Sequence, residues 1–387
     1  MSDMTETAAP GTAAAEASTE AAEAPAAPLK IFAINLGSTS TKVAYYENDQ
    51  CLYKDSIRHP SEETAAFPTV FDQKDYRMGH IKAYMDEHNI RMDELDAFVT
   101  RGGQTEPVEG GVIRINQAYV DQAMSGDYGV HVCSVGSAIA LEMTEGTKAV
   151  PLTVDPPVTD EFWPLSRYTG LAEIERISSF QALNQRAMAR YYAESQGRRY
   201  EDMNLVVVML GGGISVVAHR QGRMVDGPDA LEGDGPFSNN RCCTVPVGPL
   251  VKLCYSGKYD LQGMMHHING DAGLMAYLGT TDIIGIEQRI KDGDAYAEEV
   301  LDAMCYQTAK DVGAYATVLE GKVDAILLVG GMANSEFITS HIKRRVEWIA
   351  PVVIMPGERE MESLCENAYA ALRGETPIQE FVPDEGK

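Results

Sequence analysis

Residues 34–44 of this chain read INLGSTSTKVA, and residues 208–218 read VMLGGGISVVA. Each stretch predicts a strand, a turn of small residues and a second strand, and Leu, Gly, Val and Ala fall at matching positions in the two copies. Glycine, serine and threonine in the turns let backbone N–H groups approach an anion closely. Two such turns, one in each half of the chain, could hold a polyphosphate from both sides. The repeat therefore indicates a nucleotide-dependent phosphotransferase built from two related halves.

The composition is typical of a globular protein with room for two domains. The chain has 387 residues, of which 44% are hydrophobic and 23% are charged. Its formal net charge of -25 argues against a nucleic-acid partner, because binding to phosphate backbones needs a basic surface. The charge does not exclude a small anionic substrate, since a few cations can dominate inside a cleft.

Cysteine spacing and terminal composition suggest a cytoplasmic protein. Seven cysteines without a Cys-x-x-Cys spacing indicate neither a zinc site nor a dithiol motif, so we expect reduced thiols. The Ala-rich residues 1–29 lack the basic start and apolar core of a secretory signal and are expected to form a disordered tail. Residues 375–387 are expected to form a second tail. No apolar run reaches transmembrane length, so no membrane partner is expected.

Apolar runs alternate with helical patterns in both halves, which predicts an α/β architecture. Strands are expected at residues 30–36, 43–46, 51–57, 95–100, 149–154, 204–210, 214–219, 222–226 and 323–329. Helices are expected at residues 68–89, 132–143, 173–196, 295–319 and 358–373, with one more from about residue 335. Because the two repeated glycine turns each lead into a strand, the pattern differs from a Rossmann domain and favours a duplicated actin-like or sugar-kinase-like fold.

Three glycine turns are candidates for nucleotide binding. The first, residues 37–42 (GSTSTK), is not a Walker A loop, but its hydroxyls and lysine could contact phosphates; alone it could equally be a polar hairpin turn. The second, residues 211–213 (GGG), weakens a strand end, so close approach to phosphate is favoured over a β-bulge. The third, residues 330–334 (GGMAN), could pass under an adenosine or could be a plain strand-to-helix turn.

Three charged residues stand where loops begin or turn. Arg101 precedes a Gly-Gly pair at a strand end, and Arg241 lies in a loop rich in turn residues. Such arginines suit planar recognition of carboxylate or phosphate, although most arginines only keep a surface soluble. Asp155 ends a strand before two prolines, which suits a Mg²⁺ ligand or a charge-orienting role; a turn cap is the alternative.

With these motifs, the chain resembles the acetate/butyrate kinase family of the actin-like ATPase superfamily, from about Ile31 to Gly374. The most specific stretches are residues 35–42, 101–103, 170–176, 182–185, 210–216, 230–238 and 356–358. The resemblance implies a duplicated actin-like, acetate-kinase-type fold of two domains with a cleft between them. The N-terminal acetokinase-like domain is then expected at residues 30–170 plus 358–374, and the C-terminal nucleotide-binding domain at 171–357.

The same resemblance implies the reaction and its partners. It is reversible phosphoryl transfer between ATP and butyrate, or a related short- or branched-chain fatty acid, giving the acyl phosphate and ADP. ATP or ADP and Mg²⁺ are the implied cofactors, and the carboxylic acid or acyl phosphate is the implied substrate. Assembly into a homo-oligomer is expected by analogy.

The resemblance also assigns roles to individual residues. The catalytic group comprises Arg101 near the acyl substrate, Asp155 orienting Mg²⁺, Gln181 as an amide donor, and Arg241 neutralising the phosphoryl group or orienting the acid. The nucleotide- and phosphate-binding group comprises Asn35, Ser38, Ser40, Lys42, Gly211, Gly212, Gly213, Gly330, Gly331 and Asn334. The metal site comprises Asn35 and Glu360, with Glu358 as the alternative to Glu360.

Two positions differ from the family pattern. Gln181 and Met209 stand where the family usually has histidine. Neither side chain carries a positive charge, and Met209 offers no hydrogen-bond donor. This difference leaves a second interpretation open, a nucleotide-binding pseudokinase of the same fold with a regulatory or partner-binding role.

Overall fold

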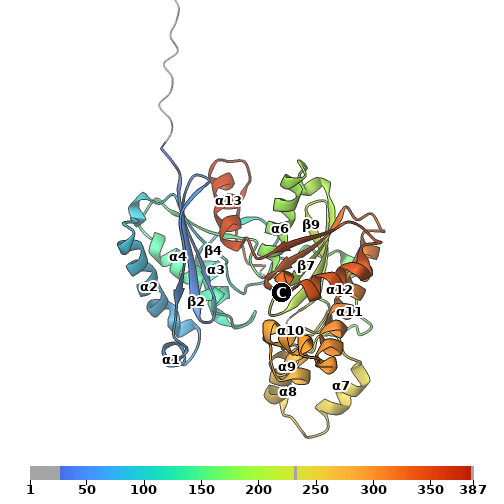
Figure 1. Cartoon of the computed structure of the whole chain (residues 1–387). Helices are drawn as coiled ribbons and strands as arrows, with labels where there is room; N and C mark the ends of the chain where they lie inside the picture. Colours follow the sequence, from blue (N-terminus) through green and yellow to red (C-terminus); the bar gives the residue numbers. More distant parts are fainter. Residues whose placement is uncertain (1–26, 231–232, 385–387) are drawn as a thin grey trace, which may run out of the picture.

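Two β-sheets, one in each half of the chain, form the framework of the molecule (Figure 1). The computed structural model describes residues 27–230 and 233–384. The first sheet has the order β12-β5-β6-β4-β1-β2-β3 and the second the order β11-β10-β7-β8-β9. The first sheet comprises β1 (Lys30–Leu36), β2 (Ser40–Glu47), β3 (Gln50–Arg58), β4 (Ala97–Thr100), β5 (Val112–Arg114), β6 (Val150–Val154) and β12 (Ile378–Glu380). The second comprises β7 (Asn204–Leu210), β8 (Ile214–Arg220), β9 (Arg223–Asp226), β10 (Ala325–Gly330) and β11 (Val352–Pro356).

The two sheets share a local topology that explains the sequence repeat. In the first sheet, β1 pairs antiparallel with β2 and parallel with β4. In the second, β7 pairs antiparallel with β8 and parallel with β10. Each of the two repeated glycine turns is therefore the connection of a hairpin made of two inner strands of its sheet, as the repeat predicts. The duplicated α/β architecture expected from the sequence is confirmed.

Helices cover the faces of both sheets. Before β7 in the sequence they are α1 (Ser61–Thr64), α2 (Lys74–Glu87), α3 (Gln117–Ser125), α4 (Cys133–Thr144), α5 (Pro164–Arg167) and α6 (Ala182–Ser195). After β9 in the sequence they are α7 (Val247–Cys254), α8 (Leu261–Asn269), α9 (Gly273–Leu278), α10 (Ile283–Lys291), α11 (Ala295–Val318), α12 (Glu336–Val346) and α13 (Glu360–Leu372). Short 3₁₀ turns occur at Phe71–Gln73, Met92–Glu94, Tyr200–Asp202 and Gly331–Asn334.

Each sheet packs against its own helices through a separate apolar core. The long α11 buries Leu301, Met304 and Val312, spaced at helical intervals, against β7, β8 and β10. Fully burying each such side chain contributes about 1.5–3 kcal/mol relative to leaving it exposed. In the first half, α2 and α4 pack on the opposite face from α13. The site residues on the strand ends are thus supported by two rigid layers.

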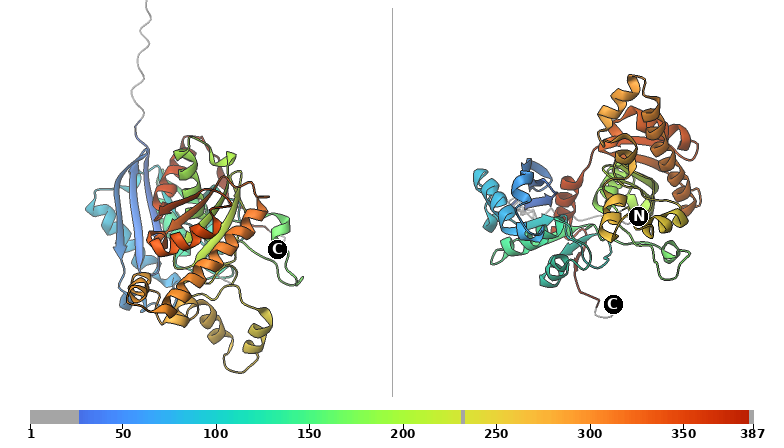
Figure 2. Two further views of the ribbon diagram at one scale, coloured as in Figure 1. Left: turned by 45° about the vertical axis from the view of Figure 1, so that its right-hand side comes forward. Right: turned by 90° about the horizontal axis from the view of Figure 1, so that it is seen from below.

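The last helix returns from the second sheet to the first. After β11 the chain crosses over, and α13 buries Met361, Leu364 and Cys365 against β1, β4 and β6. We call the first sheet with its helices the first lobe, and the second sheet with its helices the second lobe. Figure 2 shows α13, in red, on the side of the first lobe that faces the second lobe. Helix α13 also contacts α6. This placement supports the proposed division into residues 30–170 plus 358–374 and residues 171–357.

Two sequence-based expectations are wrong in part. The helix expected at 173–196 begins only at Ala182, because Arg176 is drawn into ion pairs with Asp226 (3.0 Å) and Asp234 (3.1 Å) and holds its segment extended. The expected tail at 375–387 contains β12, which pairs with β5, and Phe381 then packs against Tyr119. Residues 1–26 and 385–387 of the two expected tails lie outside the described residues.

The described residues contain neither a disulfide nor a helix that could span a membrane. All seven cysteines lie in the described part of the chain, and each is free. Among residues 27–230 and 233–384, none of the helices combines the length and the apolar character that a membrane span requires.

Candidate active site

The first glycine turn joins β1 to β2 and leaves backbone donors free. The N–H of Gly37 donates to the carbonyl of Ser40 over 2.8 Å, which closes the turn. Ser38 and Thr39 at its tip are exposed, and no acceptor in the described residues takes their N–H groups. Backbone N–H groups that project from a tight turn form a concavity suited to an anion. The predicted phosphate-binding residues Ser38 and Ser40 thus lie on a turn that can accept a phosphate.

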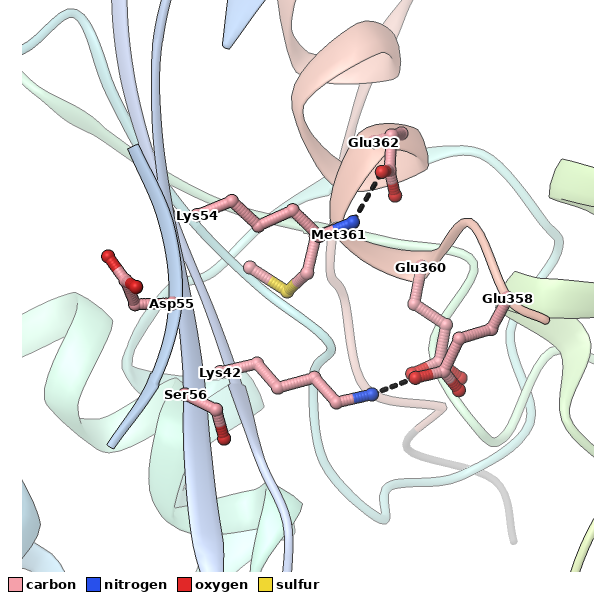
Figure 3. Close-up of a pocket in the computed structure, with 8 residues that line it drawn as sticks. All are labelled: Lys42, Lys54, Asp55, Ser56, Glu358, Glu360, Met361 and Glu362. Atoms are coloured by element: carbon pink, nitrogen blue, oxygen red, sulfur yellow. Dashed lines mark hydrogen bonds and ion pairs between the residues drawn. The ribbon is translucent and has the colours of Figure 1, made fainter. Parts of the chain in front are cut away.

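A cleft of about 380 Å³ lies next to this turn, between β2, β3 and the start of α13 (Figure 3). Lys42 on β2 extends across it and forms an ion pair with Glu358. Asn35, buried on β1, donates its side-chain amide to Oε2 of Glu360 over 2.6 Å. Glu360 is the first residue of α13, where the positive end of the helix dipole favours a carboxylate. The predicted metal-site and phosphate-binding residues of the first lobe therefore lie together.

Two of the three glutamates that line this cleft, Glu358 and Glu360, fit a Mg²⁺ ion. Asn35 occupies Oε2 of Glu360, while no donor in the described residues contacts Oε1. Those residues also hold no cluster of three or more His, Cys, Asp or Glu side chains that would enclose a metal. Mg²⁺ does not need such a cage, because it usually takes one or two carboxylates and completes its shell with phosphates and water. Glu360 and Glu358 would supply the protein ligands.

A second, smaller cleft of about 130 Å³ collects three of the four predicted catalytic residues. Arg101 follows β4, Gln181 precedes α6, and Arg241 lies in the loop after β9. Neither guanidinium forms an ion pair with a carboxylate among the residues that the structure describes. Two such arginines at one small space create a positive site that suits a carboxylate and a transferring phosphoryl group.

Apolar groups form much of the remaining wall of this arginine cleft. Pro157, Phe180 and Ala230 line it together with polar groups that include His131. Burial, and then the nearby charge of Arg101, lowers the pKa of His131, so the imidazole is neutral at pH 7. The cleft therefore combines two cationic side chains with an uncharged, partly apolar lining.

Gly213 of the second glycine turn leaves room for Arg241. A Cβ atom built on Gly213 would lie 2.6 Å from Nη1 of Arg241 and 3.2 Å from its Cζ. The same Nη1 donates to the carbonyl of Ala230 over 3.0 Å. The guanidinium is thus fixed between a loop carbonyl and a glycine that no larger residue can replace without moving it. The close approach of Arg241 accounts for this glycine, and its predicted contact with phosphate stays a prediction.

The second and third glycine turns pack directly on one another. Gly330 has φ +91°, and a Cβ there would lie 2.5 Å from the carbonyl oxygen of Leu210. Gly212 and Gly331 have no atoms within 4 Å of a built Cβ, so both remain open to a ligand. The turns thus form one surface of the second lobe, as a shared nucleotide site requires.

Gly211 and Asn334, which were also predicted to bind the nucleotide, form hydrogen bonds within their own turns. The N–H of Gly211 donates to the carbonyl of Gly213 over 3.0 Å. The side-chain amide of Asn334 donates to the carbonyl of Gly331 over 2.9 Å. Asn334 therefore caps its own 3₁₀ turn, and its predicted contact with a nucleotide stays a prediction.

Asp155, the fourth predicted catalytic residue, lines neither of the two clefts. It is fully buried, and its Oδ1 accepts from the N–H of Gly111 (2.8 Å) and from Nη1 of Arg186 (2.5 Å). Its φ of +41° is a left-handed backbone conformation, which costs a residue other than glycine about 1–2 kcal/mol. The contacts around Asp155 therefore hold its backbone in this conformation. Arg186 also pairs with Glu161 at 2.6 Å. The structure places Asp155 in a buried ion network, and its role toward Mg²⁺ stays a prediction.

Comparisons with known proteins agree with this geometry. A model of the acetokinase family matches residues 177–353. A protein of Bacteroides thetaiotaomicron named probable butyrate kinase is 44% identical over 352 residues, which covers 91% of this chain and 99% of that protein. The chain belongs to the acetokinase family. The expected class, a phosphotransferase with a carboxyl group as acceptor, is therefore confirmed, and family membership implies the use of ATP or ADP.

Solved structures show the fold of this chain independently. The acetate kinase of Porphyromonas gingivalis superposes with a TM-score of 0.71 at 16% identity, covering 88% of this chain and 99% of that one. A propionate kinase of Francisella tularensis gives a TM-score of 0.68 at 16% identity, covering 87% and 98%. The fold is the duplicated actin-like ATPase fold of these kinases.

The two positions that differ from the usual acetokinase histidines have partners of their own. Oε1 of Gln181 accepts from the Ser215 hydroxyl over 2.8 Å, while the residue still lines the arginine cleft. The sulfur of Met209 lies 3.1 Å from the Asn184 amide nitrogen, and Asn184 accepts from the backbone N–H of Arg359 over 3.0 Å. Met209 thus packs at a junction of β7, α6 and the approach to α13. The comparisons do not support the pseudokinase alternative.

Two buried arginines contact predicted site residues but were not themselves predicted from the sequence. Arg186 holds Asp155, and Arg77 lies beneath the first glycine turn. Arg186 directly follows a stretch, residues 182–185, that the family resemblance singles out, which was a usable signal. Arg77 has no motif around it, and an arginine on a helix reads as a solvent-exposed residue.

Proposed function

We propose that this member of the acetokinase family reversibly transfers the γ-phosphoryl group of ATP to butyrate, or to a related short- or branched-chain fatty acid. The arginine cleft is the observation that carries the proposal. Arg101 and Arg241 meet there without carboxylate partners in the described residues, and Pro157, Phe180 and Ala230 form apolar wall. A short fatty acid has the same two parts, an anionic head and an apolar tail. The name of the Bacteroides relative supports butyrate among such acids.

The reaction needs little acid–base chemistry from the protein. One carboxylate oxygen attacks the γ-phosphorus and forms a new O–P bond, while the bond from γ-phosphorus to the β,γ-bridging oxygen breaks and its electron pair leaves with ADP. Because the carboxylate is already anionic, no general base is required. Positioning and charge neutralisation carry the catalysis, as in other phosphoryl transfers. Arg101 and Arg241 would hold the acid and offset the negative charge that the reacting groups bring together.

The three glycine turns would hold the nucleotide between the lobes. Ser38 and Lys42 approach the phosphates from the first lobe, and Gly212 and Gly331 leave open surface for the nucleotide on the second. Glu360 and Glu358 would hold Mg²⁺, which neutralises charge on the phosphate oxygens when bound. Closure of the lobes would keep water from the acyl phosphate.

Chain length of the acid is set by the apolar wall, with limited stringency. The cleft measures about 130 Å³, so it suits small acids in the present conformation. One methylene group changes discrimination by only about 1–3 kcal/mol, so neighbouring acids should also react. Butyrate and its branched relatives are therefore expected to overlap as substrates.

Residence in the cytoplasm and assembly into a homo-oligomer remain predictions.

A hydroxamate assay tests the proposed function. The protein is incubated with Mg-ATP and each acid from formate to hexanoate, including isobutyrate and isovalerate, and hydroxylamine traps any acyl phosphate. We expect product with a preference for a four- or five-carbon acid. Arg101→Gln should raise KM for the acid while leaving ATP binding intact, whereas the matched control Arg345→Gln, on α12, should change neither. Absence of acyl phosphate with every acid, in a folded protein that binds ATP, would refute the proposal.

A further inference from the structure

Arg77, on α2, holds the first glycine turn from beneath. The side chain is fully buried. Its Nη2 donates to the carbonyl of Ser38 over 3.0 Å, and its Nη1 lies 3.4 Å from the carbonyl of Ser40 and 3.3 Å from the hydroxyl of Thr41. Its Nε donates to Oε1 of Gln73 over 2.9 Å, which fixes the guanidinium on its own helix. One planar group thus ties α2 to three successive points of the turn.

The charge of Arg77 has no counter-charge within the described protein. All four of its acceptors are neutral, and no carboxylate of the described residues forms an ion pair with it. The equally buried Arg186 differs, because Asp155 and Glu161 both pair with it. A buried cation without an anionic partner is costly and is rarely kept without a reason. Burial lowers the pKa of Arg77, but a guanidinium keeps its proton in proteins.

The hydrogen bonds to Arg77 also set the direction of the turn's own donors. In a trans peptide the C=O and N–H groups point to opposite sides. Because the Ser38 carbonyl points at Arg77, the N–H of Thr39, which belongs to the same peptide unit, points away from it. Within the described chain this N–H has no acceptor. The turn therefore has a guanidinium on one side and a free donor on the other.

We propose that Arg77 is a positioning residue for the polyphosphate of the bound nucleotide. It orients the turn so that backbone N–H groups face the phosphate, and it supplies from below a fixed positive charge for which the bound phosphate is the counter-charge. Arg77 itself does not touch the ligand. The inference rests on the proposed function only for the identity of the ligand, a nucleotide carrying phosphates at this turn.

Comparing ATP with adenosine separates this role from a structural one. Binding of each ligand is measured by titration calorimetry on the full chain as wild type, Arg77→Gln, Arg77→Lys and Arg345→Gln. Arg345 is the matched control, because it pairs with Asp302 of α11 at 2.8 Å and lines neither of the two clefts. Folding of each variant is checked by circular dichroism and thermal unfolding.

The expected results differ between the charged and the uncharged ligand. Arg77→Gln should weaken ATP binding by about 10- to 100-fold, since it removes a charge and reorients the donors, and should leave adenosine binding unchanged. Arg77→Lys keeps the positive charge but loses the planar guanidinium that contacts three acceptors of the turn. Its loss of affinity for ATP should therefore be smaller, about three- to tenfold. The Arg345→Gln variant should bind both ligands as the wild type does.

Several outcomes would overturn the inference. One is an equal loss of affinity for ATP and adenosine in the Arg77 variants, which indicates a structural role alone. Unchanged ATP binding in Arg77→Gln is another, and equal wild-type affinity for ATP and adenosine is a third. If Arg77→Gln does not fold, the affinities for ATP and adenosine are compared in Arg77→Lys instead. Acyl phosphate formation plays no part in these readouts, so a protein that binds ATP through Arg77 but phosphorylates no acid would refute the proposed function alone.

Discussion

Replacing Gly213 by alanine tests how tightly the second glycine turn positions Arg241. The added Cβ would lie 2.6 Å from Nη1 of Arg241, whereas an ordinary contact begins at about 3.4 Å, so the guanidinium must move by roughly 0.8 Å. The obstacle is the end of a flexible side chain, and Gly213 has no positive φ, so the fold should survive. A displacement of about 1 Å at a catalytic group can cost about 100-fold in rate.

We therefore expect Gly213→Ala to lower kcat for acyl phosphate formation by about 10- to 100-fold while its melting temperature stays near that of the wild type. The assay is hydroxamate formation at saturating ATP and acid, with thermal unfolding measured on the same preparation. Gly313→Ala, in α11, is the matched control, because its added methyl group meets no atom within 4 Å and lies away from the clefts. Wild-type kcat in a folded Gly213→Ala protein would refute the proposed placement of Arg241 at the reacting groups.

Three further predictions concern stability and the metal. Asp155→Asn should lower the free energy of unfolding by about 3–5 kcal/mol, because buried Arg186 loses one of its two acids; a loss in urea denaturation below about 1 kcal/mol would contradict this. Burial, and then a neighbouring arginine, lowers the pKa of His59 to about 4 from 6.5, so the unfolded chain binds protons first as pH falls. The free energy of unfolding should thus fall between pH 6.5 and 4, less steeply in His59→Gln, and an unchanged slope in that variant would exclude this origin. Glu360→Gln should raise the Mg²⁺ concentration for half-maximal activity at least about tenfold, unlike the control Glu362→Gln, and equal Mg²⁺ dependence in the two would exclude Glu360 as a ligand.

Local sequence patterns predicted the inner hairpin of each sheet well. The hairpins at both glycine turns combine β-branched strands with turns of small residues, and both signals are contained in about ten consecutive residues. The long apolar runs of β10 and α11 were equally readable. Sequence reasoning failed where distant contacts decide the outcome, as in the segment that Arg176 holds extended.

The missed elements are short or lie at sheet edges. β5 and β12 have three residues each, too few for a period to emerge, and they become strands by pairing with each other and with β6. The exposed and partly buried residues of β11 lack the continuous apolar run of an inner strand. Helices α7 to α10, at the lower right of Figure 1, are short, with six to nine residues each, and α9 and α10 pack on α11.

The candidate site was predicted more by family pattern than by local chemistry. Arg101, Gln181 and Arg241 lie far apart in sequence, and no spacing rule brings them to one cleft. The resemblance grouped them, and the structure places all three there. Arg77 was beyond both routes, because its function depends on a turn that only the fold brings next to α2.

Phosphorus NMR on the complete reaction tests the central claim most directly. The protein is mixed with Mg-ATP and butyrate labelled with oxygen-18 in its carboxylate, without hydroxylamine. If a carboxylate oxygen attacks the γ-phosphorus, an acyl phosphate resonance should appear with the isotope shift of a labelled bridging oxygen, in step with ADP. Formation of ADP and inorganic phosphate without a labelled acyl phosphate would contradict the account.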